Sequence, residues 1–263
     1  MKHIAKLMIA ALALTLILTA LPGCGAKGKT LDEVKAAGQL VIATSPDFPP
    51  FESLDGSGNV SGIEIDIMNI ICEKLGVKLV IKQMSFESVL PGVQAGKFDV
   101  GVSGITVTEK RLKNALFTDP YCMAAQAIVV TADSPIKSKA DLAGKKVSVQ
   151  TGTTAESFCN ENGYNVLAYE ANSDAEAAVL GGKVDAWVID DLTAKDMVDA
   201  YNAEHPGALV ILSDAMTTEP YAFGFAFGSE DLVAEVNKIV KELVDSGEIQ
   251  KIFEKYDAPY TKP

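Results

Sequence analysis

The sequence has few of the residues that build metal centres and nucleophilic active sites. Its 263 residues include two histidines and four cysteines, and only one histidine, His205, lies beyond the first few residues. Metal clusters and histidine-based catalytic triads therefore lack members. The glycines Gly56, Gly58 and Gly62 also miss the dinucleotide-binding spacing by one residue. We expect no catalytic residue, no metal site and no cofactor.

Long apolar runs are also scarce, and the one present lies near the N-terminus. Residues 7–20 form a stretch of 14 residues that is interrupted only by Thr15 and Thr19. Lys2, His3 and Lys6 precede it. This stretch is too short to cross a bilayer but is typical of the core of a secretory signal. We therefore predict that the chain is exported.

The segment Leu21-Pro22-Gly23-Cys24 follows and resembles the lipobox of bacterial lipoproteins, in which the cysteine becomes the acylated first residue. Pro22 replaces the usual small residue. We predict a lipoprotein signal peptide over residues 1–23, a lipid anchor at Cys24 and a flexible tether over residues 24–30. The protein would then lie on the outer face of the cytoplasmic membrane, or on its periplasmic side if the host has an outer membrane. The alternative is an ordinary secretory cleavage site with an idle cysteine.

Positive charge is in the minority: 23 Lys and Arg stand against 35 Asp and Glu, which gives a net charge of −12. Such a body repels nucleic acid and anionic lipid surfaces, so we expect no nucleic-acid partner. Apolar residues make up 48% of the chain, enough for a sizeable core in one or two domains, and we expect a monomer. Cys72, Cys122 and Cys159 form no C-x-x-C pair, which favours buried free thiols, although an oxidised pair stays open.

Short apolar runs bounded by turn residues alternate with helical patterns through most of the chain. One helical pattern covers Asp66 to Leu75, with its isoleucines on one face. The apolar runs predict strands at Leu40–Thr44, Lys78–Met84, Val100–Ser103, Lys146–Gln150 and Ala186–Ile189. This alternation predicts an α/β chain with mainly parallel sheets.

An internal repeat indicates two lobes, because residues 89–100 resemble residues 177–186. In each copy a helix ends at glycine, a Lys-x-Asp turn follows and an apolar strand begins. The alternative is a chance repeat of a common helix-turn-strand unit. We predict that residues 31–126 and 221–263 form the first lobe and that residues 127–220 form the second. The chain would cross between them near 125–131 and 218–222, as a hinge of two extended segments.

Ligands of open α/β sheets bind beyond the carboxyl ends of the strands, so the residues that follow each predicted strand are candidates for a site. Their chemistry suits a zwitterion. A carboxylate matches the planar fork of Arg111, whereas an ammonium matches the acceptor oxygens of Asp190, Thr106 and the Gly104 carbonyl. Phe48 and Phe86 could then form apolar walls around the side chain of the ligand.

Each of these residues also has a simpler interpretation. Arg111 could lie on a solvated helix face, although the threonines before it are typical of a helix cap. Phe48 and Phe86 could belong to the core. Asp190 or Asp191 could cap the helix that begins near Leu192, and this role suits Asp191 better.

Several motifs in order resemble the polar amino-acid branch of the bacterial extracellular solute-binding proteins that serve ABC importers, the family 3 type. The resemblance runs from about Leu40 to Tyr256. Its most specific parts are Ala43-Thr44 to Phe48-Pro49-Pro50-Phe51-Glu52, Gly62-Ile63-Glu64-Ile65-Asp66, Gly96-Lys97-Phe98-Asp99, Thr106-x-Thr108-Glu109-x-Arg111, Phe117-Thr118-Asp119-Pro120-Tyr121, and Leu142 to Val147 leading to Gln150-Thr151-Gly152-Thr153-Thr154.

The resemblance implies a type II periplasmic-binding-protein fold that closes around an L-amino acid and delivers it to a membrane permease. It implies that Arg111 holds the α-carboxylate with Thr106 and Thr154. Gly104, Thr106 and Asp190 would hold the α-ammonium, and Phe48 and Phe86 would contact the ligand.

Ser45 stands where relatives for basic or amide side chains often carry an acid, which disfavours a basic ligand. Asp47, Glu52 or Glu219 could substitute for that acid, and Gln150 weakly favours a polar uncharged side chain.

Two other functions stay open on the sequence alone. The first is an enzyme similar to cyclohexadienyl dehydratase on the same scaffold, with Glu156 or Glu219 as its acid. The second is a ligand-sensing ectodomain for a separate signalling partner.

Overall fold

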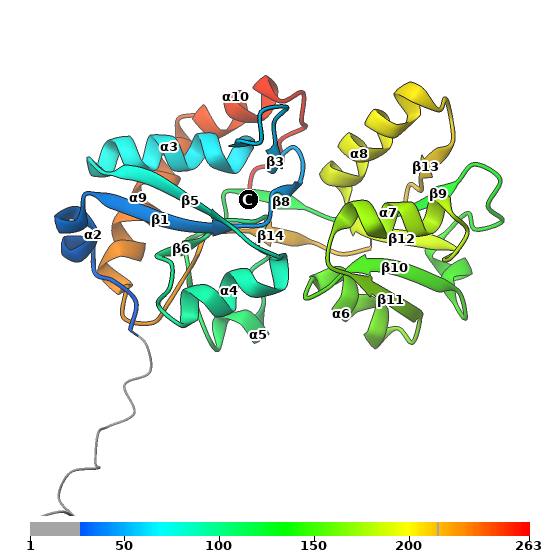
Figure 1. Cartoon of the computed structure of the whole chain (residues 1–263), viewed down its shortest axis with the longest axis horizontal. Helices are drawn as coiled ribbons and strands as arrows, with labels where there is room; N and C mark the ends of the chain where they lie inside the picture. Colours follow the sequence, from blue (N-terminus) through cyan, green and yellow to red (C-terminus); the bar gives the residue numbers. More distant parts are fainter. Residues whose placement is uncertain (1–26, 215) are drawn as a thin grey trace, which may run out of the picture.

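The computed structural model describes residues 27–214 and 216–263, which form two lobes side by side (Figure 1). The predicted signal peptide and the predicted lipidation site at Cys24 lie outside these residues. Among the helices of the described ranges, none combines the length and the apolar character needed to cross a bilayer.

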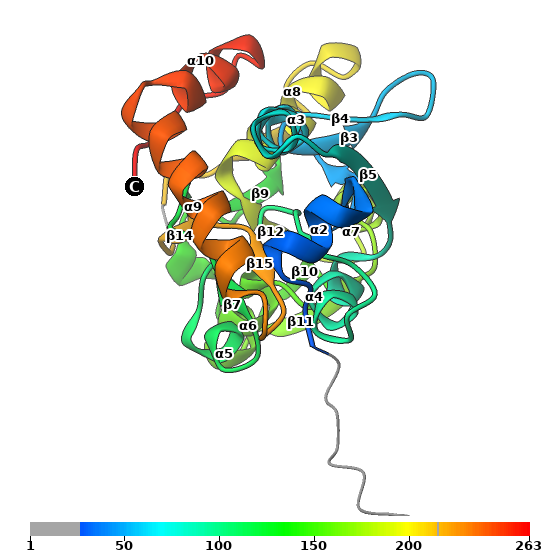
Figure 2. The same ribbon diagram turned by 90° about the vertical axis from the view of Figure 1, so that its left-hand side faces the viewer.

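The first lobe is built on a five-stranded sheet in the order β5-β1-β6-β15-β7. The strands are β1 (Gln39–Thr44), β5 (Lys78–Gln83), β6 (Val100–Gly101), β7 (Leu116–Phe117) and β15 (Gly224–Phe225). Its helices are α2 (Leu31–Ala37), α3 (Ile63–Leu75), α4 (Phe86–Gln94), α5 (Glu109–Leu112), α9 (Glu230–Asp245) and α10 (Glu248–Lys255). A small antiparallel sheet follows β1 and contains β2 (Asp47–Phe48), β3 (Glu52–Leu54) and β4 (Val60–Ser61). Figure 2 shows α2 and α9 at the end of this lobe that faces away from the second lobe.

The second lobe is built on a sheet in the order β11-β10-β12-β9-β13. The strands are β9 (Gln126–Thr131), β10 (Lys146–Gln150), β11 (Asn165–Tyr169), β12 (Ala186–Asp190) and β13 (Leu209–Ile211). Its helices are α6 (Thr154–Glu161), α7 (Asn172–Leu180) and α8 (Asp191–Glu204), with a 3-10 turn, η1, at Lys139–Leu142.

The two sheets share one topology, which explains the repeat in the sequence. In each sheet the first strand of the βαβ units lies between the next two, and all three are parallel. The helix that begins each repeated segment, α4 or α7, leads into the third of these strands, β6 or β12. The expectation of an α/β fold in two lobes is therefore confirmed.

Both sheets also contain antiparallel pairs beside the parallel pairs that the sequence predicted. In the first sheet β15 pairs antiparallel with β6 and β7, and in the second β9 pairs antiparallel with β12 and β13. Both β9 and β15 follow a crossing from the other lobe. They enter their sheets at the edge where the parallel strands end and so run in the opposite direction.

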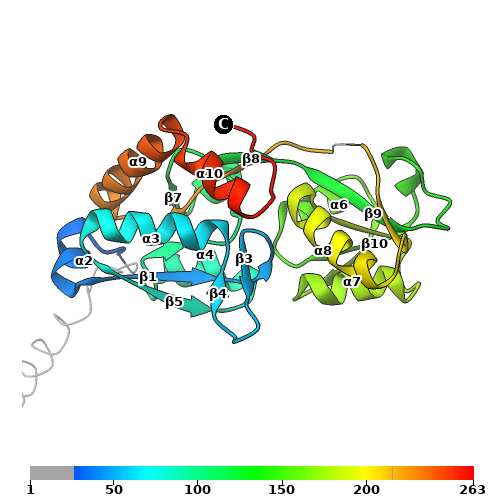
Figure 3. The same cartoon turned by 90° about the horizontal axis from the view of Figure 1, so that it is seen from above.

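Two strands connect the lobes and lie side by side (Figure 3). They are β8 (Cys122–Ala124) and β14 (Glu219–Tyr221), which pair antiparallel to each other and belong to neither large sheet. The second connection lies where the sequence predicted a crossing. The first begins earlier than predicted, because residues 126–131 already form β9, which pairs with two strands of the second sheet.

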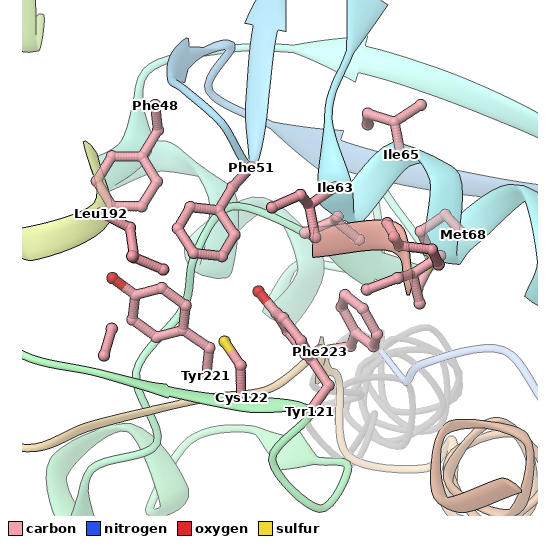
Figure 4. Close-up of a cluster of buried hydrophobic side chains, with 14 of the residues drawn as sticks. Phe48, Phe51, Ile63, Ile65, Met68, Tyr121, Cys122, Leu192, Tyr221 and Phe223 are labelled. Carbon is pink, nitrogen blue, oxygen red and sulfur yellow. The ribbon is translucent and has the colours of Figure 1, made fainter. Parts of the chain in front are cut away.

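A continuous apolar core runs through the first lobe, past the connection and into the second lobe. Figure 4 shows part of this core, where the rings of Phe48, Phe51 and Tyr221 lie around Leu192 of α8, and Ile63 of α3 lies beyond Phe51. The helix α3 begins three residues before the predicted pattern because Gly62 precedes it with φ of 143° and lies against the Phe51 backbone. A side chain at Gly62 would overlap the Phe51 carbonyl.

Three cysteines, Cys72, Cys122 and Cys159, are buried and free, as predicted. Burial raises the pKa of the Cys72 thiol to about 11 and that of the Cys159 thiol to about 12. Both thiols are therefore protonated and unreactive at neutral pH.

The start of the described chain is held against the first lobe, which differs from a tether that is free throughout. The Gly28 N–H donates to the Phe227 carbonyl at 2.9 Å, and the Lys29 ammonium pairs with Asp99 at 2.9 Å. Thr30 caps α2. Residues 23–30 also match the spacing of a phosphate-binding loop. However, the Lys29 and Thr30 side chains are engaged in these contacts.

Candidate functional site: a cavity between the lobes

A small cavity lies between the lobes and collects most of the predicted site residues. Eight of the nine line it: Phe48, Phe86, Gly104, Thr106, Arg111, Gln150, Thr154 and Asp190. Ser103 and Thr153 line it as well. The carboxyl ends of the strands in both sheets therefore face each other across this cavity.

Helix starts position three of the polar residues. Arg111 lies on the short helix α5, whose first turn is held by a hydrogen bond from the Arg111 N–H to the Thr108 hydroxyl at 3.1 Å. This is the threonine cap that the sequence predicted. In the second lobe, Thr153 caps α6 and Thr154 is its first residue. The backbone N–H groups at this helix start suit an anion.

The Arg111 guanidinium is the cation of the cavity. It donates to the Thr106 carbonyl at 2.9 Å and, across the cleft, to the Gly152 carbonyl at 3.2 Å. Its carbon lies 5.5 Å from the centre of the Phe86 ring. Burial lowers the pKa of Arg111, while the charges of Glu219 and Asp190 oppose that shift. The side chain is thus fixed at the cavity wall and remains cationic.

Asp190 is the acid of the cavity and is 7% exposed. It accepts a hydrogen bond of 2.6 Å from the Gln126 side chain. Burial, together with the charge of Glu219, raises the pKa of Asp190 to about 8. Asp190 makes no capping hydrogen bond to α8, whereas Asp191 accepts from the Leu192 N–H at 2.8 Å. Asp190 thus occupies the N-cap position without a side-chain cap, and Asp191 is the first residue of α8.

Phe48 and Phe86 both belong to the cavity wall. Phe48 is also part of the core, because its ring stacks on Phe51 with centroids 5.6 Å apart (Figure 4). Gly104 lies directly beside this ring with φ of 52°, and a β-carbon at Gly104 would come within 2.5 Å of it. Glycine at this position lets the loop after β6 approach Phe48.

Ser45 does not line the cavity, unlike the other eight predicted residues. Its hydroxyl donates to Asp47 at 2.8 Å, and its N–H donates to the Ser103 hydroxyl at 3.1 Å. It therefore lies behind the wall. Ser103 and Thr153 could have been selected from the sequence, because each lies just after a strand in the same way as the residues chosen.

Asp47 joins the two lobes, a role that the sequence did not indicate. Its carboxylate accepts from the Gln150 side chain at 3.0 Å and from the Asn172 N–H at 2.9 Å. Its carbonyl accepts from the Asn172 side chain at 3.3 Å. The residues after β1 are thereby held against the ends of β10 and β11, and this contact closes the cavity on one side.

A pair of buried acids, Glu52 and Glu64, lies beneath the floor of the cavity. Glu52 accepts from the Ser103 hydroxyl at 2.9 Å, and Glu64 accepts from the Gly104 N–H at 3.0 Å and from Tyr121 at 2.7 Å. Burial and the neighbouring charge of Glu64 raise the pKa of Glu52 well above its usual range. Burial also raises the pKa of Glu64, so both acids are shifted toward their neutral forms.

The two acids considered for an enzyme lie away from the inner cavity. Glu156 accepts from the Gly152 N–H at 2.7 Å, and Glu219 lines an outer groove that also includes Lys110 and Arg111. The described residues contain no group of three or more His, Cys, Asp or Glu side chains arranged to hold a metal ion.

Residues 40–258 match the family model of the bacterial extracellular solute-binding proteins, family 3. The chain belongs to this family. It is 31% identical to the arginine-binding extracellular protein ArtP of Bacillus subtilis, over 95% of this chain and 96% of that protein. It is 30% identical to a probable histidine-binding protein of Neisseria gonorrhoeae, over 96% of each chain.

Solved structures of similar proteins agree with this assignment to family 3. A mutant of ArgBP from T. maritima superposes with a TM-score of 0.80 at 38% identity, covering 86% of this chain and 98% of that one. An ancestral amino acid-binding protein described as a precursor of cyclohexadienyl dehydratase, AncCDT-1, superposes with a TM-score of 0.78 at 35% identity. That comparison covers 87% of this chain and 99% of the other. The type II periplasmic-binding fold and the family are thus established for this chain.

Proposed function

We propose that this family 3 solute-binding protein captures an L-amino acid in the cavity between its lobes and delivers it to the permease of an ABC importer. The observation that carries the proposal is that Arg111 and Asp190 line one cavity, from different lobes. A half-buried cation and a buried acid in one cavity match the two charges that every α-amino acid carries. The relatives named for arginine and histidine binding support this ligand class.

The proposed contacts follow from the chemistry of the wall. Arg111, with the Thr106 hydroxyl and the helix start at Thr154, holds the α-carboxylate. Asp190, the Gly104 carbonyl and the Thr106 hydroxyl hold the α-ammonium, and Phe48 and Phe86 contact the side chain. Gln150 lies at the wall of the second lobe, and Ser45 supports the wall through Asp47.

Ligand binding and lobe closure are coupled in this proposal. Only the closed form makes contacts from both lobes at once, so the ligand stabilises that form, which docks on the permease. No bond of the ligand is made or broken. The similar ancestral protein is itself described as amino acid-binding, which supports binding over dehydratase chemistry.

The proposal extends to location and to the lobe limits. The family is extracellular, and the N-terminal pattern supports a signal peptide over 1–23 and a lipid anchor at Cys24. We place the first lobe at 31–126 and 221–263 and the second at 127–220, with β8 and β14 as the hinge. One protomer contains the whole cavity, which supports a monomer.

The test is a thermal-shift screen of the twenty L-amino acids against the unmodified protein and two alanine variants. A ligand that binds only the folded state raises its melting temperature. Arg111→Ala should abolish every such shift, because removing one partner of a buried pair costs about 3–5 kcal/mol. Lys110→Ala, which removes an exposed neighbouring cation from the same helix, should keep the shifts. A shift preserved in Arg111→Ala would overturn the carboxylate assignment.

A second measurement separates delivery from sensing. Uptake of the identified amino acid should fall in a strain that lacks this protein. Normal uptake in that strain would instead favour the sensing ectodomain.

A further inference from the structure

We propose that the side chain of the bound amino acid carries a positive charge, as a guanidinium or an ammonium group. This inference rests on the proposed function and deepens it. Its basis is the part of the cavity wall formed by Ser103 and Gln150, where every hydrogen-bond donor of the side chains is already engaged and only acceptors remain.

Ser103 has no proton to offer to a ligand. Its hydroxyl donates to Glu52 at 2.9 Å and accepts from the Ser45 N–H at 3.1 Å. A hydroxyl has one proton and two lone pairs, so one lone pair of Ser103 remains. The Ser103 hydroxyl can therefore only accept a hydrogen bond from a ligand.

The side chain of Gln150 likewise has no free donor. Its two amide N–H groups donate to the Asp47 carboxylate at 3.0 Å and to the Glu170 carbonyl at 3.0 Å. Both partners are acceptors only, so the orientation of the amide is fixed by its surroundings. The Gln150 oxygen accepts from the Asn172 side chain at 3.2 Å and keeps one free lone pair. Gln150 therefore also enters the cavity as an acceptor.

The side-chain donors of the wall that remain belong to Arg111 and to the hydroxyls of Thr106 and Thr154. The α-carboxylate uses these donors in the proposed function. A ligand carboxylate beside Ser103 and Gln150 would meet only acceptors from these two side chains. A ligand amide would leave its own carbonyl without a partner there, which is costly in a closed cavity.

The charges behind this wall point the same way. Asp47 and the Glu52 and Glu64 pair lie one hydrogen bond behind Gln150, Ser103 and Gly104. Within the described ranges, none of these three carboxyl groups has a Lys, Arg or His partner within 4.0 Å. Arg111 and Asp190 are balanced by the two charges of the amino-acid backbone. A cationic side chain would balance the charge of Asp47, which lies behind Gln150.

The aromatic residues of the wall also suit a cationic side chain, because the rings of Phe48 and Phe86 can stack on a flat guanidinium. From the sequence, Gln150 favoured a ligand with an uncharged side chain. The hydrogen bonds of Gln150 instead favour a ligand with a cationic side chain. The reason is that the donors of Gln150 are used by Asp47 and Glu170, which no sequence pattern reveals.

Calorimetric titration of the unmodified protein with closely matched amino acids tests this inference. L-citrulline has the shape of L-arginine but carries a neutral urea group. We expect L-arginine or L-lysine to bind at least about 100-fold more tightly than L-citrulline, L-glutamine and L-glutamate. Citrulline or glutamine binding as tightly as the cationic ligands would overturn the inference and leave the proposed function intact. A protein that binds no amino acid would overturn both.

A pair of charge-removing variants provides the second arm. Asp47→Asn keeps an oxygen for the donors of Gln150 and Asn172 but removes the charge behind Gln150. We expect the ratio of arginine to citrulline affinity to fall about tenfold in this variant. Asp199→Asn removes the same charge from an exposed site on α8 and should leave the ratio unchanged. A ratio unaltered by Asp47→Asn would show that the ligand does not experience this charge and would count against the inference.

Discussion

The contact that Asp47 makes across the cleft should set how readily the lobes close. Replacing this residue by alanine removes two hydrogen bonds to its carboxylate, from Gln150 at 3.0 Å and from Asn172 at 2.9 Å. Hydrogen bonds to charged groups contribute about 1.5–3 kcal/mol each, and the lower value suits the half-buried Asp47. The closed form should therefore lose about 3 kcal/mol relative to the open form, which corresponds to about 100-fold in the closure equilibrium.

Two measurements follow that loss. Small-angle X-ray scattering should show a larger radius of gyration for ligand-free Asp47→Ala than for the unmodified protein. The apparent dissociation constant should rise by up to about 100-fold, because it scales inversely with the population of the binding-competent form. Neither measurement needs the ligand to touch Asp47. An unchanged radius together with an affinity within twofold of the unmodified protein would refute the reasoning.

A pair of glycine variants checks closure from the other side of the cleft. Gly152 has φ of 81°, and a β-carbon there would lie 3.1 Å from the Glu87 β-carbon in the opposite lobe. Gly144 has φ of 74° with nothing within 4 Å. Both alanine variants carry the same backbone strain. Only Gly152→Ala should also weaken binding, and equal effects on binding would argue against close approach at this point.

Two further predictions concern the acid of the cavity and the N-terminus. The pKa of Asp190 is about 8 in the folded protein and 3.8 in the unfolded chain. Between these pH values Asp190 is ionised only in the unfolded chain, so the stability of the ligand-free protein falls as the pH rises. Asp190→Asn should therefore melt at a higher temperature than the unmodified protein at pH 8.5, with a smaller gap at pH 5, and should lose amino-acid binding. A melting difference that does not change with pH would contradict the assigned pKa. Labelled palmitate should enter the unmodified protein but not Cys24→Ser, and equal labelling would exclude Cys24 as the anchor.

Most of the cavity could be predicted because it follows from strand order. Phe48, Gly104, Gln150 and Asp190 each lie at or just beyond the end of a strand. Parallel strands bring their carboxyl ends to one edge, so a pattern that locates the strands also locates these residues. The helix cap at Thr108 likewise follows from local sequence and was predicted with Arg111.

The rest of the wall depends on contacts between distant segments. Asp47 meets Asn172 across 125 residues of chain, and Gln126 meets Asp190 across 64. Neither pair has a local signature. Ser45 was placed in the wall because it follows a strand, but its hydroxyl turns to Asp47, two residues later. Which protons face the ligand could be read only from the complete hydrogen-bond network.

The N-terminal segment contacts Asp99 and Phe227, which both belong to the first lobe and do not line the cavity. Asp99 precedes β6, so this attachment lies at the edge of the sheet opposite the residues that follow that strand. A pull on the chain at its start would be borne by the first lobe, and neither β8 nor β14 would carry tension. The second lobe can then move without bearing this force, so attachment at the N-terminus does not hinder lobe closure.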